Sequence, residues 1–523
     1  MADTLSHSNL LPVVSEIISA QIGLHFPRER WRDLERGLAA AARELGFNDR
    51  ESYLHSLIGA PLDRSQVEVL ARHLTIGETY FFRERRTLEI LQERILPELI
   101  RARRGGERTL RLWSAGCCTG EEPYSLAILL SEMLPDLDAW HLTILGTDMN
   151  PAFLHKATEG AYTEWSFRDA PAWVKQRYFT PRGAKQFRIL SRIRAMVNVA
   201  YLNLAEDPYP SLLNNTHAMD VILCRNVLMY FSAEGARKVV ERLQRALVEG
   251  GWLLVSASEA ACVDPSLFVR VDFPGAILFR KDSAAQQQAA RRHYEQSLPR
   301  TAPGDHWEAL APSREATAAE RLVSCESAGR TSRTTPHRPR PLPPPSTPVP
   351  ASPPSFAAAV LRYQRGDYAQ AVARASELLT VHCRGAAAAA SEELFALLAR
   401  ARANEGKLGE ALQWCDRGIA AAQLNASLHY LRAAILQAQG ELPQAEESLK
   451  RALYLDPDFV LAHFALGNLA RRQSKARDAG KHFANALSLL HRLGVNATLP
   501  EADGMTAGRL REIIQSTMDA SRA

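Results

Sequence analysis

The chain has 523 residues, of which 46% are hydrophobic and 23% are charged, close to the usage of ordinary globular proteins. Its length suggests about three domains, and its composition excludes a wholly disordered, collagen-like or disulfide-stapled protein. The 63 lysines and arginines exceed the 58 acidic residues by only 5, which argues against a dedicated nucleic-acid binder with a concentrated basic face.

The cysteines and the N-terminus indicate a reducing compartment. The 7 cysteines are scattered without CxxC spacing, so neither a zinc site nor a redox motif is predicted. The 15 histidines show no HxxxH or HExxH spacing, and we therefore expect no metal. The sequence begins without a basic region followed by an apolar run, and no charge-free apolar stretch reaches about 18 residues. We expect a cytoplasmic protein with no direct membrane insertion and no nucleic-acid partner.

Residues 1–75 are predicted to form an all-helical N-terminal domain. Apolar residues recur at intervals of three and four, which places them on one face of a helix. Two such helices are marked by Trp31, Leu34, Leu38, Ala41 and Leu45, and by Val67, Leu70, Ala71 and Leu74. The segment LTIGETYFFRE at residues 74–84 then leads into the rest of the chain, with Phe81 and Phe82 directly before Arg83. Interdomain packing with a surface charge is one explanation of that segment.

From Thr109 to about Lys281, apolar strands alternate with helical segments. The predicted strands are TLRLWSA, HLTILGTD, MVNVAYLNL, AMDVILCRN and GGWLLVSAS, and the clearest helices are PYSLAILLSEML and EGARKVVERLQRALVEG. This pattern is typical of an α/β fold with a mostly parallel sheet covered on both faces. Ligands of such sheets bind beyond the carboxyl ends of the strands.

A glycine loop, GCCTGEEP at residues 116–123, follows the first predicted strand. Its GxxxG spacing differs from the GxGxxG of dinucleotide-binding folds. Two carboxylates, Glu121 and Glu122, stand where phosphates would bind, and they would repel an anion and favour a cation. A sulfonium cofactor with an amino-acid tail fits this charge better than NAD, and a plain turn is the alternative.

Polar side chains also end two further strands. Asp148 is placed to bind both hydroxyls of a ribose; the alternative is a helix N-cap, because Asn150-Pro151 opens the next helix. Arg225 and Asn226 directly follow the strand AMDVILC at the expected ligand edge, where capping and turn formation is the alternative. The sequence after this strand lacks the Asn-Pro-Pro-aromatic turn that is expected of a nucleic-acid amino-methyltransferase.

Composition divides the remaining chain into a linker and a repeat region. Residues 283–355 are rich in proline, serine and arginine and predict a solvated, disordered linker, with a PxxP ligand as the alternative. In residues 356–490 the small residues Gly366, Gly406, Gly440 and Ser474 recur at intervals of 40, 34 and 34, each followed five residues later by alanine. This spacing resembles tetratricopeptide (TPR) repeats, a helical solenoid whose concave face usually binds protein segments. Residues 491–523 are predicted to be a helical or flexible tail.

Taken in order, five segments resemble the chemotaxis receptor methyltransferases, the CheR type of protein-glutamate O-methyltransferase. They are TIGETYFFRE, LWSAGCCTGEEPYS, GTDMNPAFLHKA, YLNL and CRNVLMYF. The resemblance covers residues from about 10 to 281. It implies a Rossmann-like domain at 76–282 that binds S-adenosylmethionine and carries a small antiparallel β-subdomain at about 160–200. The turn at 181–183 between apolar stretches agrees with a hairpin there.

The resemblance also implies the site. On matching positions, cofactor contacts are implied for Thr79, Arg83, Glu122, Asp148, Asn203, Leu204, Arg225 and Asn226. Arg83 and Tyr230 are implied to face the substrate carboxylate. The family often has an asparagine two residues before the matched threonine, where this chain has Gly77, so one side-chain contact at the cofactor edge is missing.

The implied function is methyl transfer to glutamates of the cytoplasmic domain of a methyl-accepting chemotaxis-type receptor. With its repeats the chain is similar to the Wsp members, which act in surface sensing and biofilm formation, and the repeats imply a protein partner or self-regulation. The loop from Phe179 to Phe187 is short, similar to members that do not bind a receptor's C-terminal pentapeptide. Arg188, Arg192 and Arg194 face either the acidic receptor helices or solvent.

Elementary chemistry agrees with this implication. A glutamate side chain has an ordinary pKa of about 4.3, so at neutral pH it is already a carboxylate and needs no general base. Its attack on a sulfonium methyl group cancels two charges, so the enzyme has mainly to orient the reactants. Two other hypotheses stay open: a signalling scaffold that binds S-adenosylmethionine without catalysis, and methylation of a small carboxylic acid.

Overall fold

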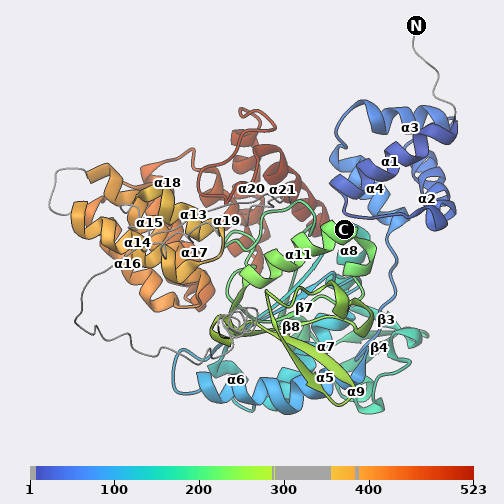
Figure 1. Cartoon of the computed structure of the whole chain (residues 1–523), viewed down its shortest axis with the longest axis horizontal. Coiled ribbons are helices and arrows are strands. Elements are labelled where there is room, and N and C mark those ends of the chain that lie inside the picture. Colours follow the sequence, from blue (N-terminus) through green and yellow to red (C-terminus); the bar gives the residue numbers. More distant parts are fainter. Residues whose placement is uncertain (1–6, 286–287, 289–354, 383–387, 523) are drawn as a thin grey trace, which may run out of the picture. The chain divides into compact units, whose positions relative to one another are not determined.

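The computed structural model describes residues 7–285, 288, 355–382 and 388–522 (Figure 1). Most of the predicted linker, residues 289–354, lies outside the described residues. Within the described part of the chain, no helix is both long and apolar enough to span a bilayer.

The N-terminal region is helical, as predicted. Its helices are α1 (His7–Gln21), α2 (Trp31–Glu44), α3 (Arg50–Gly59) and α4 (Arg64–Leu74). Side chains fix two of the starts: Asp49 accepts the backbone N–H of Ser52, and Asp63 and Gln66 form a reciprocal capping box. The predicted face of α2 supplies Leu34, Leu38 and Ala41 to a core shared by all four helices. After the segment at 74–84, α5 (Arg85–Ile90), a π-helical turn (Leu91–Ile95) and α6 (Leu96–Arg103) lead to the sheet.

A seven-stranded sheet forms the centre of the next region. Its strands are β1 (Thr109–Ala115), β2 (His141–Asp148), β6 (Val197–Tyr201), β7 (Met219–Leu223), β8 (Leu247–Leu254), β9 (Val269–Phe273) and β10 (Ala276–Arg280), in the order β6-β2-β1-β7-β8-β10-β9. The first five are parallel, as predicted, whereas β9 and β10 add an antiparallel edge that the sequence analysis did not predict. In the register of β1 and β2, Ala115 lies opposite Thr147, so the glycine loop and Asp148 emerge side by side.

Helices cover both faces of this sheet, as expected for α/β architecture. Along β1, Leu110 and Leu112 join the core that contains α7 (Glu121–Met133), whereas Trp113 and Ala115 join the core that contains α11 (Ala233–Ala246). This alternation follows from the two-residue period of a strand. α8 (Pro151–Glu159) follows β2. The central strands β1 and β7 are therefore buried on both faces, which directs a ligand to the ends of the strands.

The predicted antiparallel insertion is a three-stranded sheet in the order β3-β5-β4. Its strands are β3 (Ala161–Thr163), β4 (Phe179–Arg182) and β5 (Gln186–Ile189), with the helical turn Glu164–Phe167, α9 (Ala172–Tyr178) and α10 (Ser191–Arg194) around them. The turn at Gly183 has φ +66°, a conformation that favours glycine. The arginines of this region are partly engaged within the domain, since Arg182 pairs with Glu159 and the Arg192 guanidinium lies 5.6 Å from the Tyr178 ring centre.

The C-terminal region consists of helix pairs, which confirms the repeat prediction. Its helices are α13 (Phe356–Gln364), α14 (Tyr368–His382), α15 (Ala388–Asn404), α16 (Leu408–Ala421), α17 (Ala426–Gln439), α18 (Leu442–Leu455), α19 (Val460–Arg472), α20 (Ala476–Leu490) and α21 (Ala507–Arg522). The four repeated small residues share a left-handed turn, with φ of +81°, +79°, +85° and +59°. The four alanines that follow them are buried at helix contacts. α21 adds Leu510 and Ile514 to the core of the last repeats.

Candidate active site

A cavity of about 950 Å³, counted out to its open mouth, lies at the carboxyl ends of four adjacent strands. The segments that follow β6, β2, β1 and β7 all contribute to its wall. It is lined by every residue that the sequence analysis proposed for the site: Thr79, Arg83, Glu122, Asp148, Asn203, Leu204, Arg225, Asn226 and Tyr230. Ile22 and Leu24, just after α1, also line it, so the N-terminal helical region supplies part of the wall.

The glycine loop is bent by left-handed residues. Gly116 has φ +81°, and a Cβ there would lie 2.4 Å from a Val227 methyl carbon, so no other residue fits. Cys118 (φ +49°) and Gly120 (φ +94°) repeat this conformation, and α7 begins directly after Gly120. The backbone N–H groups of Gly116 and Cys117 both donate to the carbonyl of Thr147, each at 2.8 Å. The loop thus lies along the carboxyl end of β2, and its inner surface lines the cavity.

Only one of the two loop carboxylates faces the cavity, which corrects the expectation for Glu121. Glu121 is 1% exposed, and its carboxylate accepts hydrogen bonds from Thr119 Oγ1 (2.6 Å) and Ser166 Oγ (3.0 Å). Consecutive residues on a helix point about 100° apart, so only one of such a pair can face a given ligand. Burial raises the pKa of Glu121, although these hydrogen bonds oppose the rise.

Glu122 is held by a buried arginine. Its Oε1 accepts from Ser114 Oγ at 2.7 Å, and its Oε2 lies 2.7 Å from both Nε and Nη2 of Arg225. The Arg225 side chain is 2% exposed, and its Nη1 also donates to the carbonyl of Arg83 at 2.8 Å. Arg225 therefore ties the glycine-loop carboxylate to the segment that carries Arg83, in addition to lining the cavity.

Asp148 is fixed by backbone donors rather than by a cation. Its Oδ1 accepts from the N–H of Asn150 and its Oδ2 from the N–H of Cys118, each at 2.9 Å. The N-cap of α8 is Asn150, whose Oδ1 accepts from Ala152 N–H at 3.0 Å, so the N-cap alternative for Asp148 is wrong. Burial raises the pKa of Asp148, and the backbone hydrogen bonds partly offset that rise.

The two phenylalanines before Arg83 anchor its backbone. Phe81 packs among aromatic rings of the insertion, with its ring centre 4.9 Å from that of Tyr162 and 5.1 Å from that of Phe167. The N–H of Phe82 donates to Ser125 Oγ at 3.1 Å. Packing thus explains the phenylalanines, but within the methyltransferase domain rather than between domains as the alternative held, while the Arg83 side chain lines the cavity.

Arg83 and Tyr230 present a cation and a phenol to the same space. The Arg83 guanidinium donates to the carbonyl of Glu78 and lies 5.7 Å from the ring centre of Tyr80. Burial raises the pKa of Tyr230, and the cations Arg30 and Arg83 oppose the rise without cancelling it. The Tyr230 hydroxyl is therefore a hydrogen-bond donor at neutral pH.

Asn203 and Asn226 line the cavity and also fix the local backbone, Asn203 by side-chain hydrogen bonds and Asn226 by its own conformation. Asn203 Nδ2 donates to the carbonyl of Gln21 at 3.0 Å, and its Oδ1 accepts from Ala205 N–H at 3.0 Å. The first bond joins the turn after β6 to the end of α1, and the second lies within that turn. Asn226 adopts a left-handed backbone with φ +60°, which asparagine tolerates better than most residues.

Glu259 supports the site, and the sequence analysis missed it. This carboxylate is 1% exposed and accepts the backbone N–H groups of Asn226 (2.7 Å), Val227 (2.7 Å) and Met229 (3.2 Å). It also closes a capping box with Ser256 at the start of the 3₁₀ helix Ala257–Cys262. The Ser-x-x-Glu pattern was its only trace in the sequence, and that pattern predicts a helix start rather than a support for a loop 30 residues away.

Phe153 explains how the chain accommodates Gly77. A Cβ at position 77 would lie 2.9 Å from the ring carbon Cζ of Phe153, which also lines the cavity. The volume of an asparagine side chain at position 77 is therefore taken by an aromatic ring from α8. Where family members often have a polar asparagine side chain, this chain has the apolar ring of Phe153.

The charges of the cavity fit a ligand of net positive charge. Its lining contains three carboxylates (Glu78, Glu122 and Asp148) and two guanidinium groups (Arg83 and Arg225). S-adenosylmethionine carries a sulfonium, an ammonium and a carboxylate, so its net charge complements this set.

Comparison with known proteins agrees with this geometry. The family described as "CheR methyltransferase, SAM binding domain" matches residues 77–274. The chain is 38% identical over 218 residues to "Chemotaxis protein methyltransferase 1" of Pseudomonas aeruginosa, covering 41% of this chain and 77% of that protein. It is 32% identical over 226 residues to a "Probable chemotaxis protein methyltransferase" of Rhizobium etli, covering 42% of this chain and 81% of that protein.

Two further similarities complete the comparison. "Chemotaxis protein methyltransferase 2" of Vibrio cholerae is 34% identical over 203 residues, covering 39% of this chain and 69% of that protein. A solved kinesin light chain with nearly identical TPR-like repeats from Podosopora anserina is 15% identical, covers 32% of this chain and 91% of its own, and has a TM-score of 0.24. The repeat assignment rests on the helix pairs and their spacing. The chain belongs to the CheR methyltransferase family, with S-adenosylmethionine as its methyl donor.

Proposed function

We propose that this chain is a protein-glutamate O-methyltransferase that esterifies glutamate side chains in the cytoplasmic domain of a methyl-accepting chemotaxis-type receptor. The names of its relatives, chemotaxis protein methyltransferases, support a chemoreceptor as the acceptor. Because the chain adds TPR repeats, we also propose a place in a surface-sensing pathway of the Wsp type. The repeats would then bind a protein partner of that pathway.

The residues of the cavity divide into those that would hold the cofactor and those that would hold the acceptor. Glu122 and Asp148 are suited to the cationic and hydroxyl groups of S-adenosylmethionine. When bound, this cofactor supplies a methyl group on positively charged sulfur, an electrophile that a carboxylate can attack without a proton transfer. Arg83 would bind one oxygen of the glutamate and Tyr230 would donate a hydrogen bond to it, which leaves the other oxygen free to react.

One observation carries this proposal: Arg83 and Tyr230 line the same cavity as Glu122 and Asp148. A cation and a phenolic donor suit a carboxylate substrate, and the acidic pair suits a cationic cofactor. The raised pKa of Tyr230 supports its role as a donor rather than a base. A carboxylate acceptor requires no base, so this arrangement needs only orientation and charge complementarity.

The test uses the full-length protein, methyl-labelled S-adenosylmethionine and the helical cytoplasmic fragment of a co-encoded receptor. We expect base-labile label on the receptor and a loss of about a hundredfold in turnover for Arg83→Ala. Arg85→Ala is the matched control, because that side chain is 63% exposed and, among the residues the structure describes, pairs with Glu89 on its own helix. Near-normal turnover by a folded Arg83→Ala protein would refute the assigned role.

Other outcomes of the same assay would favour the other hypotheses. Cofactor binding with no transfer to any receptor fragment would favour a signalling scaffold, and label on a small carboxylic acid would indicate a different acceptor.

We also propose that the chain recognises its receptor without binding a C-terminal pentapeptide tether, because the turn between β4 and β5 is short. Micromolar binding of the C-terminal pentapeptide in calorimetry would overturn that part.

A further inference from the structure

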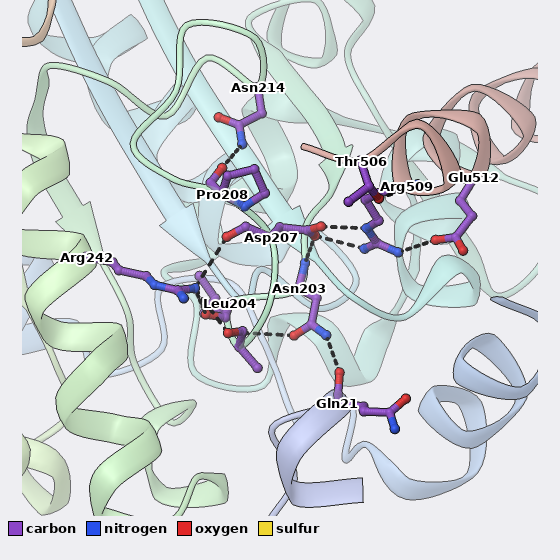
Figure 2. A network of polar contacts seen from close by, with 11 residues as sticks. Gln21, Asn203, Leu204, Asp207, Pro208, Asn214, Arg242, Thr506, Arg509 and Glu512 are labelled. Atoms are coloured by element: carbon purple, nitrogen blue, oxygen red, sulfur yellow. Dashed lines mark hydrogen bonds and ion pairs between the residues drawn. The ribbon is translucent and has the colours of Figure 1, made fainter. Parts of the chain in front are cut away.

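A buried ion pair joins the last helix of the chain to the wall of the cofactor cavity (Figure 2). Arg509 of α21 donates from Nε to Asp207 Oδ1 at 2.6 Å and from Nη2 to Asp207 Oδ2 at 2.9 Å. The Asp207 side chain is 4% exposed and the Arg509 side chain 19%. Two parallel hydrogen bonds between these planar groups make this one of the geometrically most specific ion pairs that proteins form.

Asp207 in turn holds the backbone that lines the cavity. Its Oδ2 accepts the N–H of Asn203 at 2.6 Å, and its own N–H donates to the Asn203 carbonyl at 2.9 Å. Asn203 and Leu204 both line the cavity. One carboxylate oxygen is therefore shared between the C-terminal helix and the turn at residues 203–207, as the dashed lines in Figure 2 show.

The turn is held from two sides. Arg242 of α11 donates to the carbonyls of Ala205 (3.1 Å) and Asp207 (3.4 Å), so one side is fixed within the methyltransferase domain. Arg509 fixes the other side and is itself oriented by Glu512, 2.6 Å from its Nη1. Nearby, Ser211 Oγ donates to Asp503 Oδ2 at 2.7 Å, a second contact with the segment before α21.

We propose that Arg509 is a positioning residue for the cofactor cavity: through Asp207 it holds Asn203 and Leu204 in place, so that cofactor binding and the docking of α21 are coupled. Coupling of this kind is reciprocal, because a ligand that favours one docked state is favoured by it to the same extent. A protein that binds the repeats and displaces α21 would lower the affinity for S-adenosylmethionine. The inference rests on cofactor binding and is independent of which group accepts the methyl.

The first test measures the dissociation constant of S-adenosylhomocysteine for the full-length protein by calorimetry, without any acceptor. Arg509→Leu should weaken binding by about 5–150-fold, the usual range of coupling between sites. Arg511→Leu is the control on the same helix, since the hydrogen bond that its side chain makes among the described residues goes to His491, at 3.5 Å, and its variant should bind normally. Arg509→Lys keeps the positive charge but not the planar guanidinium that makes two parallel hydrogen bonds. Its affinity for S-adenosylhomocysteine should lie between those of the other two variants.

Kinetics and hydrogen exchange separate positioning from general stability. In Arg509→Leu the KM for S-adenosylmethionine should rise, while kcat at saturating cofactor stays near that of the unaltered protein. In the unaltered protein, S-adenosylhomocysteine should slow amide exchange in residues 507–517, a result that does not depend on any variant folding. Unchanged exchange on cofactor addition, or unchanged affinity in a folded Arg509→Leu protein, would overturn the proposal.

Discussion

Replacing Glu259 by glutamine tests whether a buried carboxylate holds the loop that carries Tyr230. Glu259 Oε1 accepts the backbone N–H groups of Val227 and Met229, and Oε2 accepts those of Asn226 and Ser256. Glutamine has nearly the same shape but offers one oxygen and one NH₂ group in place of two oxygens. Whichever way its amide is turned, two backbone donors face an NH₂ group and lose their acceptor.

The size of the effect follows from this count. A buried donor left without a partner costs about 1–3 kcal/mol, so Glu259→Gln should lower the free energy of unfolding by about 2–6 kcal/mol. For a domain of about 150–250 residues, the lower limit corresponds to a fall of about 4–8 °C in Tm. Relaxation of the loop should also displace Asn226 and Tyr230, and therefore weaken cofactor binding and lower turnover.

Scanning calorimetry of the full-length protein, with and without S-adenosylhomocysteine, measures both effects. The matched control is Glu234→Gln on α11, because the Glu234 side chain is 70% exposed and its ion pair in the described part of the chain is with Lys238 on the same helix, so its change should stay within about 0.5 kcal/mol. If Glu259→Gln keeps the Tm and the cofactor affinity of the unaltered protein, the loop does not depend on this carboxylate, and the argument is refuted.

Three further predictions concern the cavity itself. Gly116→Ala should cost about 1–3 kcal/mol in thermal unfolding and abolish cofactor binding in calorimetry, because its Cβ would lie 2.4 Å from Val227 at a φ of +81°. Gly77→Asn should weaken cofactor binding because it displaces the Phe153 ring, and Phe153→Leu added to it should restore affinity; equal loss in the single and double variants would contradict this. Because burial raises the pKa of Asp148, cofactor affinity should fall as the pH drops through that raised value, in a range where a free aspartate (pKa 3.8) would still be ionised. The cofactor-free protein should gain stability over the same range, because its native state binds the proton more readily than the unfolded chain does, and Asp148→Asn should remove both trends.

Residues that line the cavity were the predictable part of this region. Asp148 ends a predicted strand, Arg225 directly follows one, and Glu122 follows the glycine loop after a third, and in a parallel sheet such positions meet at one edge. The order of the motifs then identified Arg83 and Tyr230, which lie outside any strand. Strand and loop pattern indicated the residues at the sheet edge, whereas Arg83 and Tyr230 came only from the resemblance to the family.

Residues that hold those side chains in place were not predictable. Glu259 acts on a loop about 30 residues earlier, and Asp207 pairs with a side chain 302 positions away. Neither contact leaves a periodic pattern, since a buried ion pair needs only two residues that the fold brings together. The strands β9 and β10 were missed because each has only five residues, a short signal even though VRVDF in β9 alternates apolar and polar residues.

The ion pair between Asp207 and Arg509 also bears on how the repeats should be studied. The proline-rich segment suggests a place to divide the chain, and an obvious experiment is to delete all residues after that segment. That deletion would take away the partner of Asp207 together with any surface that recruits another protein. Because the Asp207 carboxylate would lose the guanidinium that helps to hold the turn at residues 203–207, the shortened enzyme should lose cofactor affinity even if the repeats served only for recruitment. Arg509→Leu in the full chain removes only the partner of Asp207. A substitution on the repeat surface away from α21 would remove only the surface that recruits another protein. Only the pair of variants can assign a change in methylation to one cause.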